Sequence, residues 1–207
     1  PKWSILHQNI TVEVEADKPL IRVWLVVKVR PKAGVSVEKM RFRTDLLDAE
    51  TLQVNDAAGG AIDYKYSLQG AYYGNLEVQL SAPLTPGVDT DIAVNYVAEL
   101  DCDSQTTMLK SCSFDKDYHS VMFFRYYMSH GEAAHAPFTS DLHVVTDADS
   151  MAAAPGVPTG PDTLQNGRSL WHFKQVERTE NAGFVIAKFE PKGDPVPAQP
   201  SPDDPFV

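Results

Sequence analysis

Residues 21–30 read IRVWLVVKVR, and their alternation decides the fold class. The odd-numbered positions from Ile21 to Val29 are all aliphatic, whereas Arg22, Lys28 and Arg30 are charged. A period of two sends one set of side chains to a buried sheet face and the other set to solvent. The stretch therefore predicts a half-buried β-strand.

Three further segments alternate in the same way: 10–16, 76–80 and 92–100. Residues 121–128, VMFFRYYM, are apolar on both faces and predict a central strand that is covered on both sides. Residues 37–40 predict a single helical turn. Rougher strand candidates lie at 40–44, 52–55, 61–68, 142–146, 170–176 and 184–189. Ten or more short strands with little helix predict an all-β protein, an antiparallel and saddle-like β-sandwich.

The composition changes near the C-terminal end. Residues 193–207 read GDPVPAQPSPDDPFV, and they contain five prolines and almost nothing able to pack. Proline removes backbone donors and favours extended polyproline conformation. The pattern predicts one β-sandwich domain over residues 1–192, followed by a proline-rich extended linker over 193–207 that leads toward a missing C-terminal domain.

Charge and hydropathy restrict the partners. Lys and Arg number 18 and Asp and Glu number 28, so the formal net charge of the 207 residues is −10. Such a surface repels phosphate backbones, which disfavours a nucleic-acid partner. No apolar run reaches the roughly 18 residues that a membrane-spanning helix needs. The first residues, PKWS, do not form a signal peptide, so we expect a mature form or a piece of a longer protein.

Two long stretches carry a resemblance to a known family. Residues 73–100, YGNLEVQLSAPLTPGVDTDIAVNYVAEL, follow the strand MRFRTDLLDAETLQV at 40–54. Residues 136–156, APFTSDLHVVTDADSMAAAPG, precede LWHFKQVERTENAGFVIAKFEP at 170–191. Together they resemble the N-terminal β-sandwich domain of the zinc aminopeptidases of the aminopeptidase N type. The resemblance covers roughly residues 5–190 and rests on spacing and residue class.

The resemblance implies a domain role without chemistry in this chain. No stretch matches the family's H-E-x-x-H zinc motif or its G-x-M-E-N strand, which belong to a following catalytic domain. The segment FFRYYMSHGEAAHAPF at 123–138 stands where relatives have an arginine-proline-cysteine-aspartate-proline segment. We therefore expect a non-catalytic domain that packs on the absent catalytic domain of the same polypeptide and helps to form the cleft for a peptide substrate. No cofactor is expected in this chain, and zinc is expected in the missing domain. The full-length parent would be a zinc metallo-aminopeptidase.

One histidine cluster could hold a metal. His130, Glu132 and His135 lie within six residues, but a zincin needs two histidines four apart on one helix face. Five residues apart, they point to opposite faces of a strand, or about 140° apart on a helix. Gly131 and Pro137 favour a solvated loop. A small metalloenzyme that uses these three residues remains a third hypothesis.

Cys102 and Cys112 are the two cysteines of the chain, and nine residues separate them. Such a close pair between two strands predicts a disulfide, which would stabilise the fold by roughly 3 kcal/mol. A disulfide would indicate a periplasmic or extracellular location. Two unpaired thiols in a cytoplasmic protein are the alternative.

A second class of function stays open. The chain could be a stand-alone exported module that recognises peptide, glycan or protein through a sheet face. Aromatic residues such as Trp24 and Tyr66 could serve such a surface, although they more often pack against neighbouring strands. No G-x-S-x-G or nucleotide-binding glycine motif occurs, so the sequence gives no support to a serine hydrolase or a nucleotide enzyme.

Overall fold

The computed structural model describes most of the chain as strands. The described residues are 1–15, 19–44, 50–69, 73–99, 102, 112–115, 118–121, 127–133, 136–180 and 182–188. Within them the chain forms fifteen strands and no helix, in three sheets. The prediction of an all-β sandwich is thereby confirmed.

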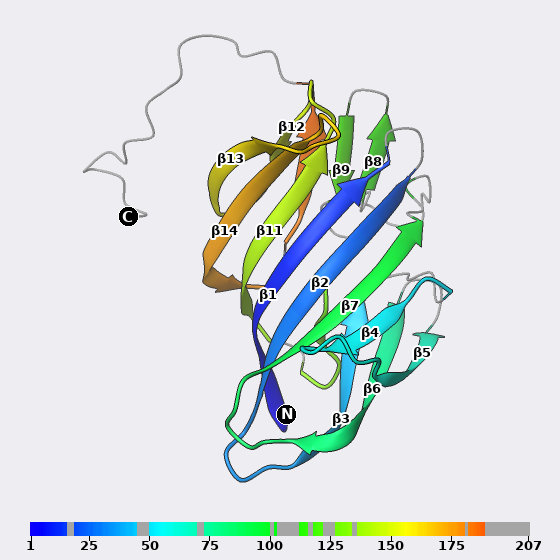
Figure 1. The fold of residues 1–207 in the computed structure, drawn as a ribbon, viewed down its shortest axis with the longest axis vertical. Coiled ribbons are helices and arrows are strands. Elements are labelled where there is room, and N and C mark those ends of the chain that lie inside the picture. Colours follow the sequence, from blue (N-terminus) through cyan, green and yellow to red (C-terminus); the bar gives the residue numbers. More distant parts are fainter. Residues whose placement is uncertain are drawn as a thin grey trace, which may run out of the picture.

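The largest sheet has seven strands, and three of the four cleanly alternating segments lie side by side in it as β1, β2 and β7 (Figure 1). Its single parallel pair is β1 with β11, and the other pairs are antiparallel. The order is β13 (Val157–Thr163), β14 (Ser169–Thr179), β11 (Phe138–Thr146), β1 (Trp3–Val14), β2 (Leu20–Pro31), β7 (Thr90–Glu99), β4 (Gln53–Asp56).

Two four-stranded sheets complete the fold, one toward each end of the large sheet (Figure 1). One has the order β10 (Ser129–His130), β3 (Val37–Thr44), β6 (Tyr73–Leu84), β5 (Asp63–Gln69). The other has the order β12 (Met151–Ala153), β15 (Phe184–Ala187), β9 (Tyr118–Val121), β8 (Cys112–Asp115).

One hydrophobic core joins the three sheets. The inward row of β2 from Ile21 to Val29 is fully buried, and it packs in one cluster with Phe42 of β3 and Phe184 of β15. On the outward face of the same strand, Trp24 stays 43% exposed. The division of β2 into a buried and an exposed face follows the alternation of its sequence.

The helical turn predicted at residues 37–40 is wrong, because these residues open strand β3. The register of β3 against β6 shifts between Val37 and Lys39, so that Val37 and Met40 are both buried with two exposed residues between them. Val37 pairs with Leu84 and Lys39 pairs with Gln79, so the extra residues lie on β6, and the interrupted alternation of β3 mimics the i, i+3 spacing of a helix.

Two other expectations fall largely on residues outside the described ranges. Of the predicted central strand 121–128, Val121 ends β9, and Tyr127 and Met128 are buried, whereas 122–126 are not described. The linker predicted at 193–207 also lies outside the described residues.

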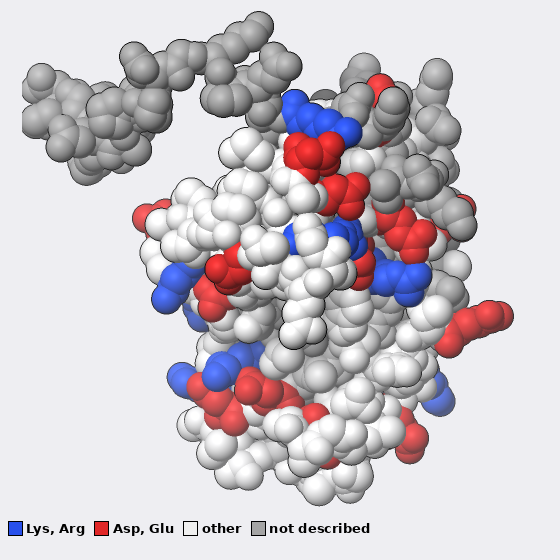
Figure 2. All heavy atoms as spheres, turned by 45° about the horizontal axis from the view of Figure 1, so that its top comes forward, with Lys and Arg blue, Asp and Glu red and all other residues white. Residues whose placement is uncertain are grey.

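The surface is mixed in charge. Figure 2 shows Lys and Arg side chains beside Asp and Glu side chains on the face that it presents. Arg22 pairs with Glu15 at 2.8 Å, and Lys188 pairs with Asp149 at 3.0 Å. In the described part of the chain, no helix has the length and apolarity to cross a bilayer.

Candidate functional site

The segment around β10 carries the sequence-predicted site, and a buried glutamine fixes its position. Gln8 of β1 is 0% exposed. Its side-chain Nε2 donates to the carbonyl oxygen of Met128 at 2.8 Å, and the Met128 amide donates to its Oε1 at 3.0 Å. A side-chain amide can satisfy one donor and one acceptor at once, so Gln8 replaces a sheet partner for Met128. The residues that follow are thereby held against β1.

His130 is a buried part of this segment. It is 2% exposed, and its ring stacks on Trp3 with centroids 3.8 Å apart. Its Nε2 donates to the carbonyl oxygen of Trp3 at 3.1 Å, and its Nδ1 accepts the amide hydrogen of Glu132 at 3.1 Å. Burial lowers the pKa of His130, and the bond to the Trp3 carbonyl opposes that effect. The ring is therefore a neutral element of the core.

The expectation of a solvated loop at His130 is wrong. Both ring nitrogens are used within the protein, so a metal at His130 would have to displace a backbone hydrogen bond. Glu132 is exposed, and His135 lies outside the described residues. In the described ranges, no group of three or more His, Cys, Asp or Glu side chains is placed to hold a metal ion.

A shallow cleft of about 230 Å³ lies beside Glu132. Its charged side chains are Lys2, Lys39, Arg41, Glu77 and Glu132. Hydrogen bonds from Lys39 and Arg41, at 3.0 and 3.3 Å, lower the pKa of the Glu77 carboxyl. Among its described residues, the cleft is a polar, ion-paired surface.

A smaller cleft of about 90 Å³ lies beside β10, where Arg43, Ser129 and Glu180 contribute polar groups. The Ser129 hydroxyl donates to the carbonyl oxygen of Arg43 at 3.1 Å, and this bond joins β10 to β3. Gly131 allows the close approach on this edge, because a Cβ there would lie 2.6 Å from the carbonyl oxygen of Arg41. The smaller cleft is lined by Ser129 and His130 of β10, and the larger cleft is lined by Glu132, which follows β10. Gln8 holds Met128, the residue just before this strand.

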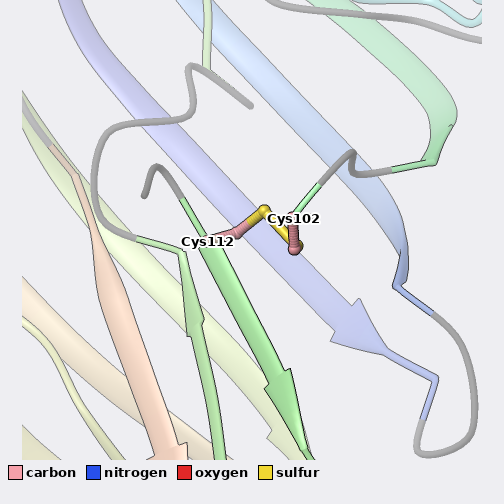
Figure 3. Close-up of a disulfide and its surroundings, with 2 residues drawn as sticks. All are labelled: Cys102 and Cys112. Atoms are coloured by element: carbon pink, nitrogen blue, oxygen red, sulfur yellow. A yellow bond between two sulfur atoms is a disulfide. The ribbon is translucent and has the colours of Figure 1, made fainter. Parts of the chain in front are cut away.

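Cys102 and Cys112 form a disulfide, with Cα atoms 5.0 Å apart (Figure 3). Cys102 follows β7, and Cys112 opens β8 and is buried at the edge of the core. The bond ties the large sheet to the sheet of β8 and β9. It has a structural position and lies at neither cleft.

The sequence reasoning missed a histidine pair. His143 of β11 and His172 of β14 face each other across two antiparallel strands, with their Nδ1 atoms 2.7 Å apart. The His172 side chain is 25% exposed. The sequence shows two strand segments, each with a histidine on its outward face. The two histidines are 29 residues apart in the chain, and only the register between their strands shows that they meet.

The fold has close structural neighbours, although no family model matches the sequence and no curated protein matches it. The crystal structure of the M1 zinc metallopeptidase from Deinococcus radiodurans superimposes with a TM-score of 0.68 at 17% identity. The match is to a zinc peptidase. A mutant of that enzyme bound to a Tyr-Ser-Ala substrate gives a TM-score of 0.66 at 17% identity. A mutant of a two-domain M1 zinc metallopeptidase bound to L-arginine gives 0.68 at 18% identity.

The coverage of these matches is unequal. They span 90% of this chain and 42% of the peptidase chains, so this chain is less than half the length of the proteins that it matches. At this identity the likeness shows the fold. The resemblance to the sandwich of the aminopeptidase N type is thereby confirmed at the level of the fold.

Proposed function

We propose that the chain is the non-catalytic N-terminal sandwich domain of a metallo-aminopeptidase-like protein. In this proposal it packs on a zinc catalytic domain of the same polypeptide and helps to wall the cleft for a peptide substrate. The observation that carries the proposal is the structural overlap, which takes in 90% of this chain and 42% of an M1 zinc metallopeptidase. The printed sequence also lacks the H-E-x-x-H motif of the family.

The zinc chemistry of the parent is assigned to the missing domain. A catalytic zinc lowers the pKa of its bound water and polarises a carbonyl group. His130 is the described histidine of the predicted cluster, and both of its ring nitrogens are hydrogen-bonded to the backbone. This chain would therefore contribute shape and support to the cleft.

The proposal is tested with two proteins. The first is the purified chain, and the second is the product of the coding frame continued beyond residue 207. We expect zinc-dependent release of N-terminal amino acids from aminoacyl-p-nitroanilides by the longer protein, and none by the chain alone. Removal of residues 1–192 from the longer protein should lower its activity or its folded yield. Zinc-dependent release by the pure chain alone would overturn the proposal.

A stand-alone exported binding module is the second candidate. Two observations favour it: the disulfide, which is typical of oxidising compartments, and the exposure of Trp24 and Val26 on the outward face of β2. A stop codon directly after Val207 would support the module, and a continued frame that encodes H-E-x-x-H would support the peptidase domain. Periplasmic or extracellular location is part of both proposals, and a reporter fusion of the complete gene tests it.

A further inference from the structure

The outward face of the seven-stranded sheet carries a pair of histidines with an unusual arrangement. His143 and His172 occupy directly opposed positions on β11 and β14, and their rings are perpendicular with centroids 4.8 Å apart. Their Nδ1 atoms approach to 2.7 Å. The pair is only half-buried, so an ion could reach it from solvent.

A carboxylate fixes the tautomer of one ring. His172 Nε2 lies 2.9 Å from Oδ2 of Asp162 on the neighbouring strand β13. A carboxylate accepts hydrogen bonds, so Nε2 of His172 carries the proton and its Nδ1 presents a lone pair toward His143. Metal-ligating histidines commonly have a carboxylate on their second ring nitrogen, because that bond orients the ring and raises its basicity.

A glycine on the neighbouring strand leaves room for the His172 ring. Gly160 on β13 approaches so closely that a Cβ at that position would lie 3.2 Å from Cδ2 of the ring. On the other side, Asp141 is two residues before His143 on the same strand face, and its Oδ1 is buried without a hydrogen-bond partner. The pair therefore sits beside a carboxylate whose negative charge would favour a bound cation.

From this geometry we infer that His143 and His172 form a binding site for divalent copper or nickel, with Asp162 as its positioning residue. The two Nδ1 atoms would be neighbouring ligands, and the ion would take the place of the proton that they share. Water would fill the other positions, because no third protein ligand joins them within the described residues.

The choice of ion follows from the ligand type, because imidazole nitrogens completed by water suit copper(II) and nickel(II). Metal–nitrogen bonds of about 2.0–2.1 Å at a right angle place two nitrogens about 2.9 Å apart, whereas a tetrahedral angle places them about 3.3 Å apart. The observed 2.7 Å is an N–H···N hydrogen bond, so the two rings would turn and separate slightly as an ion replaces the shared proton, and the right-angled arrangement needs the smaller movement. Tetragonal nitrogen sites are typical of copper(II) and nickel(II), and copper(II) has the higher affinity in the series of divalent ions.

The test uses the purified chain and Cu²⁺ in a weakly chelating buffer. We expect one Cu²⁺ per chain by isothermal titration calorimetry, and an electron paramagnetic resonance spectrum of tetragonal copper with coupling to two imidazole nitrogens. His143→Ala and His172→Ala should each weaken binding more than tenfold and remove the two-nitrogen coupling. Asp162→Asn should weaken it by about 10- to 100-fold, the usual effect of removing a carboxylate behind a ligand.

His7→Ala is the matched control, because His7 lies on the same sheet face and contacts Thr139 and Asp141 rather than the pair. It should keep the affinity and the spectrum. Ni²⁺ should bind at the same residues with lower affinity, and it should raise the melting temperature of the wild type more than that of His172→Ala. Circular dichroism checks that each variant is folded. Binding that survives His143→Ala and His172→Ala, or the absence of a two-nitrogen signal, would overturn the inference.

Discussion

Gln8 is a polar side chain among the inward-facing apolar residues of β1, such as Ile10 and Val12. Its amide makes two hydrogen bonds to the backbone of Met128, and it has no exposed surface. An apolar residue at this position would pack as well but would leave two backbone groups buried without partners. Hydrogen bonding, rather than hydrophobicity, therefore explains this residue.

Gln8→Met tests that account with a side chain of nearly the same length. We expect the free energy of unfolding to fall by about 2–6 kcal/mol, because an unsatisfied buried group costs about 1–3 kcal/mol and two are created. Urea denaturation followed by fluorescence measures the change. Gln53→Met on the exposed face of edge strand β4 is the control, with an expected change within about 0.5 kcal/mol. Equal effects at the two positions would contradict the account.

His130 should make stability depend on pH in a defined direction. Burial lowers the pKa of His130 in the folded state below the ordinary value of 6.5, so the unfolded chain binds more protons between the two values. Stability is therefore full above about pH 6.5 and is lost as the pH falls from there toward the folded-state pKa. His119, whose pKa burial also lowers, adds to the same loss.

His130→Asn removes one titrating group and should reduce the difference in stability between about pH 7.5 and pH 5.5. Urea denaturation at both values measures it. The carboxyl groups with lowered pKa values, among them Glu77 and Asp89, titrate below this window and do not interfere. The variant is less stable at both pH values because the stack on Trp3 is lost. The comparison therefore uses the slope of the free energy of unfolding against pH. An unchanged slope would show that His130 does not carry the effect.

Sequence reasoning failed at the scale of single residues for one physical reason. His130 looks like a loop residue beside Gly131, yet its partner Trp3 is 127 residues earlier in the chain. His143 and His172 look isolated, and only the strand register brings them together. A periodic pattern reports which face a side chain occupies and does not report which distant residue covers it.

At the scale of elements, the alternating segments predicted strands well, because sheet faces impose a period of two on buried residues. The four clean segments lie in β1, β2, β6 and β7, although β1 ends at Val14, one described residue before the gap in the first segment. The failure at Val37–Met40 arises from an irregular register between β3 and β6, which changes the period locally. The disulfide also connects elements, since Cys102 follows β7 and Cys112 is the first residue of β8.

The double variant Cys102→Ser, Cys112→Ser should be less stable by about 3 kcal/mol, because the cross-link restricts the unfolded chain over a loop of about ten residues. Denaturation with and without dithiothreitol measures it. The reductant should destabilise the wild type toward the level of the variant and should leave the variant unchanged. If the stability of the wild type does not change with dithiothreitol and equals that of the variant, the cysteines are unpaired in solution.

At the scale of the whole molecule, the sequence predicted one sandwich but not its division into three sheets. The division depends on long-range choices, such as the parallel pairing of β1 with β11, which are about 130 residues apart in the chain. Such pairings are settled by packing, since many strand orders satisfy the same alternation. The single core cluster that results spans all three sheets, so the sheets should unfold together.

A chain that ends at Lys192 tests the predicted limit of this cooperative unit. Residues 193–207 contain five prolines and few apolar side chains, so their removal should take little buried surface from the core. We expect the same melting temperature, within about 1 °C, and the same denaturant m-value as for the full chain, because m scales with the surface exposed on unfolding. A further deletion that removes β15 should abolish cooperative unfolding, since Phe184 and Ile186 belong to the core. A clear fall in melting temperature after removal of 193–207 alone would place that segment within the domain and would contradict the predicted linker.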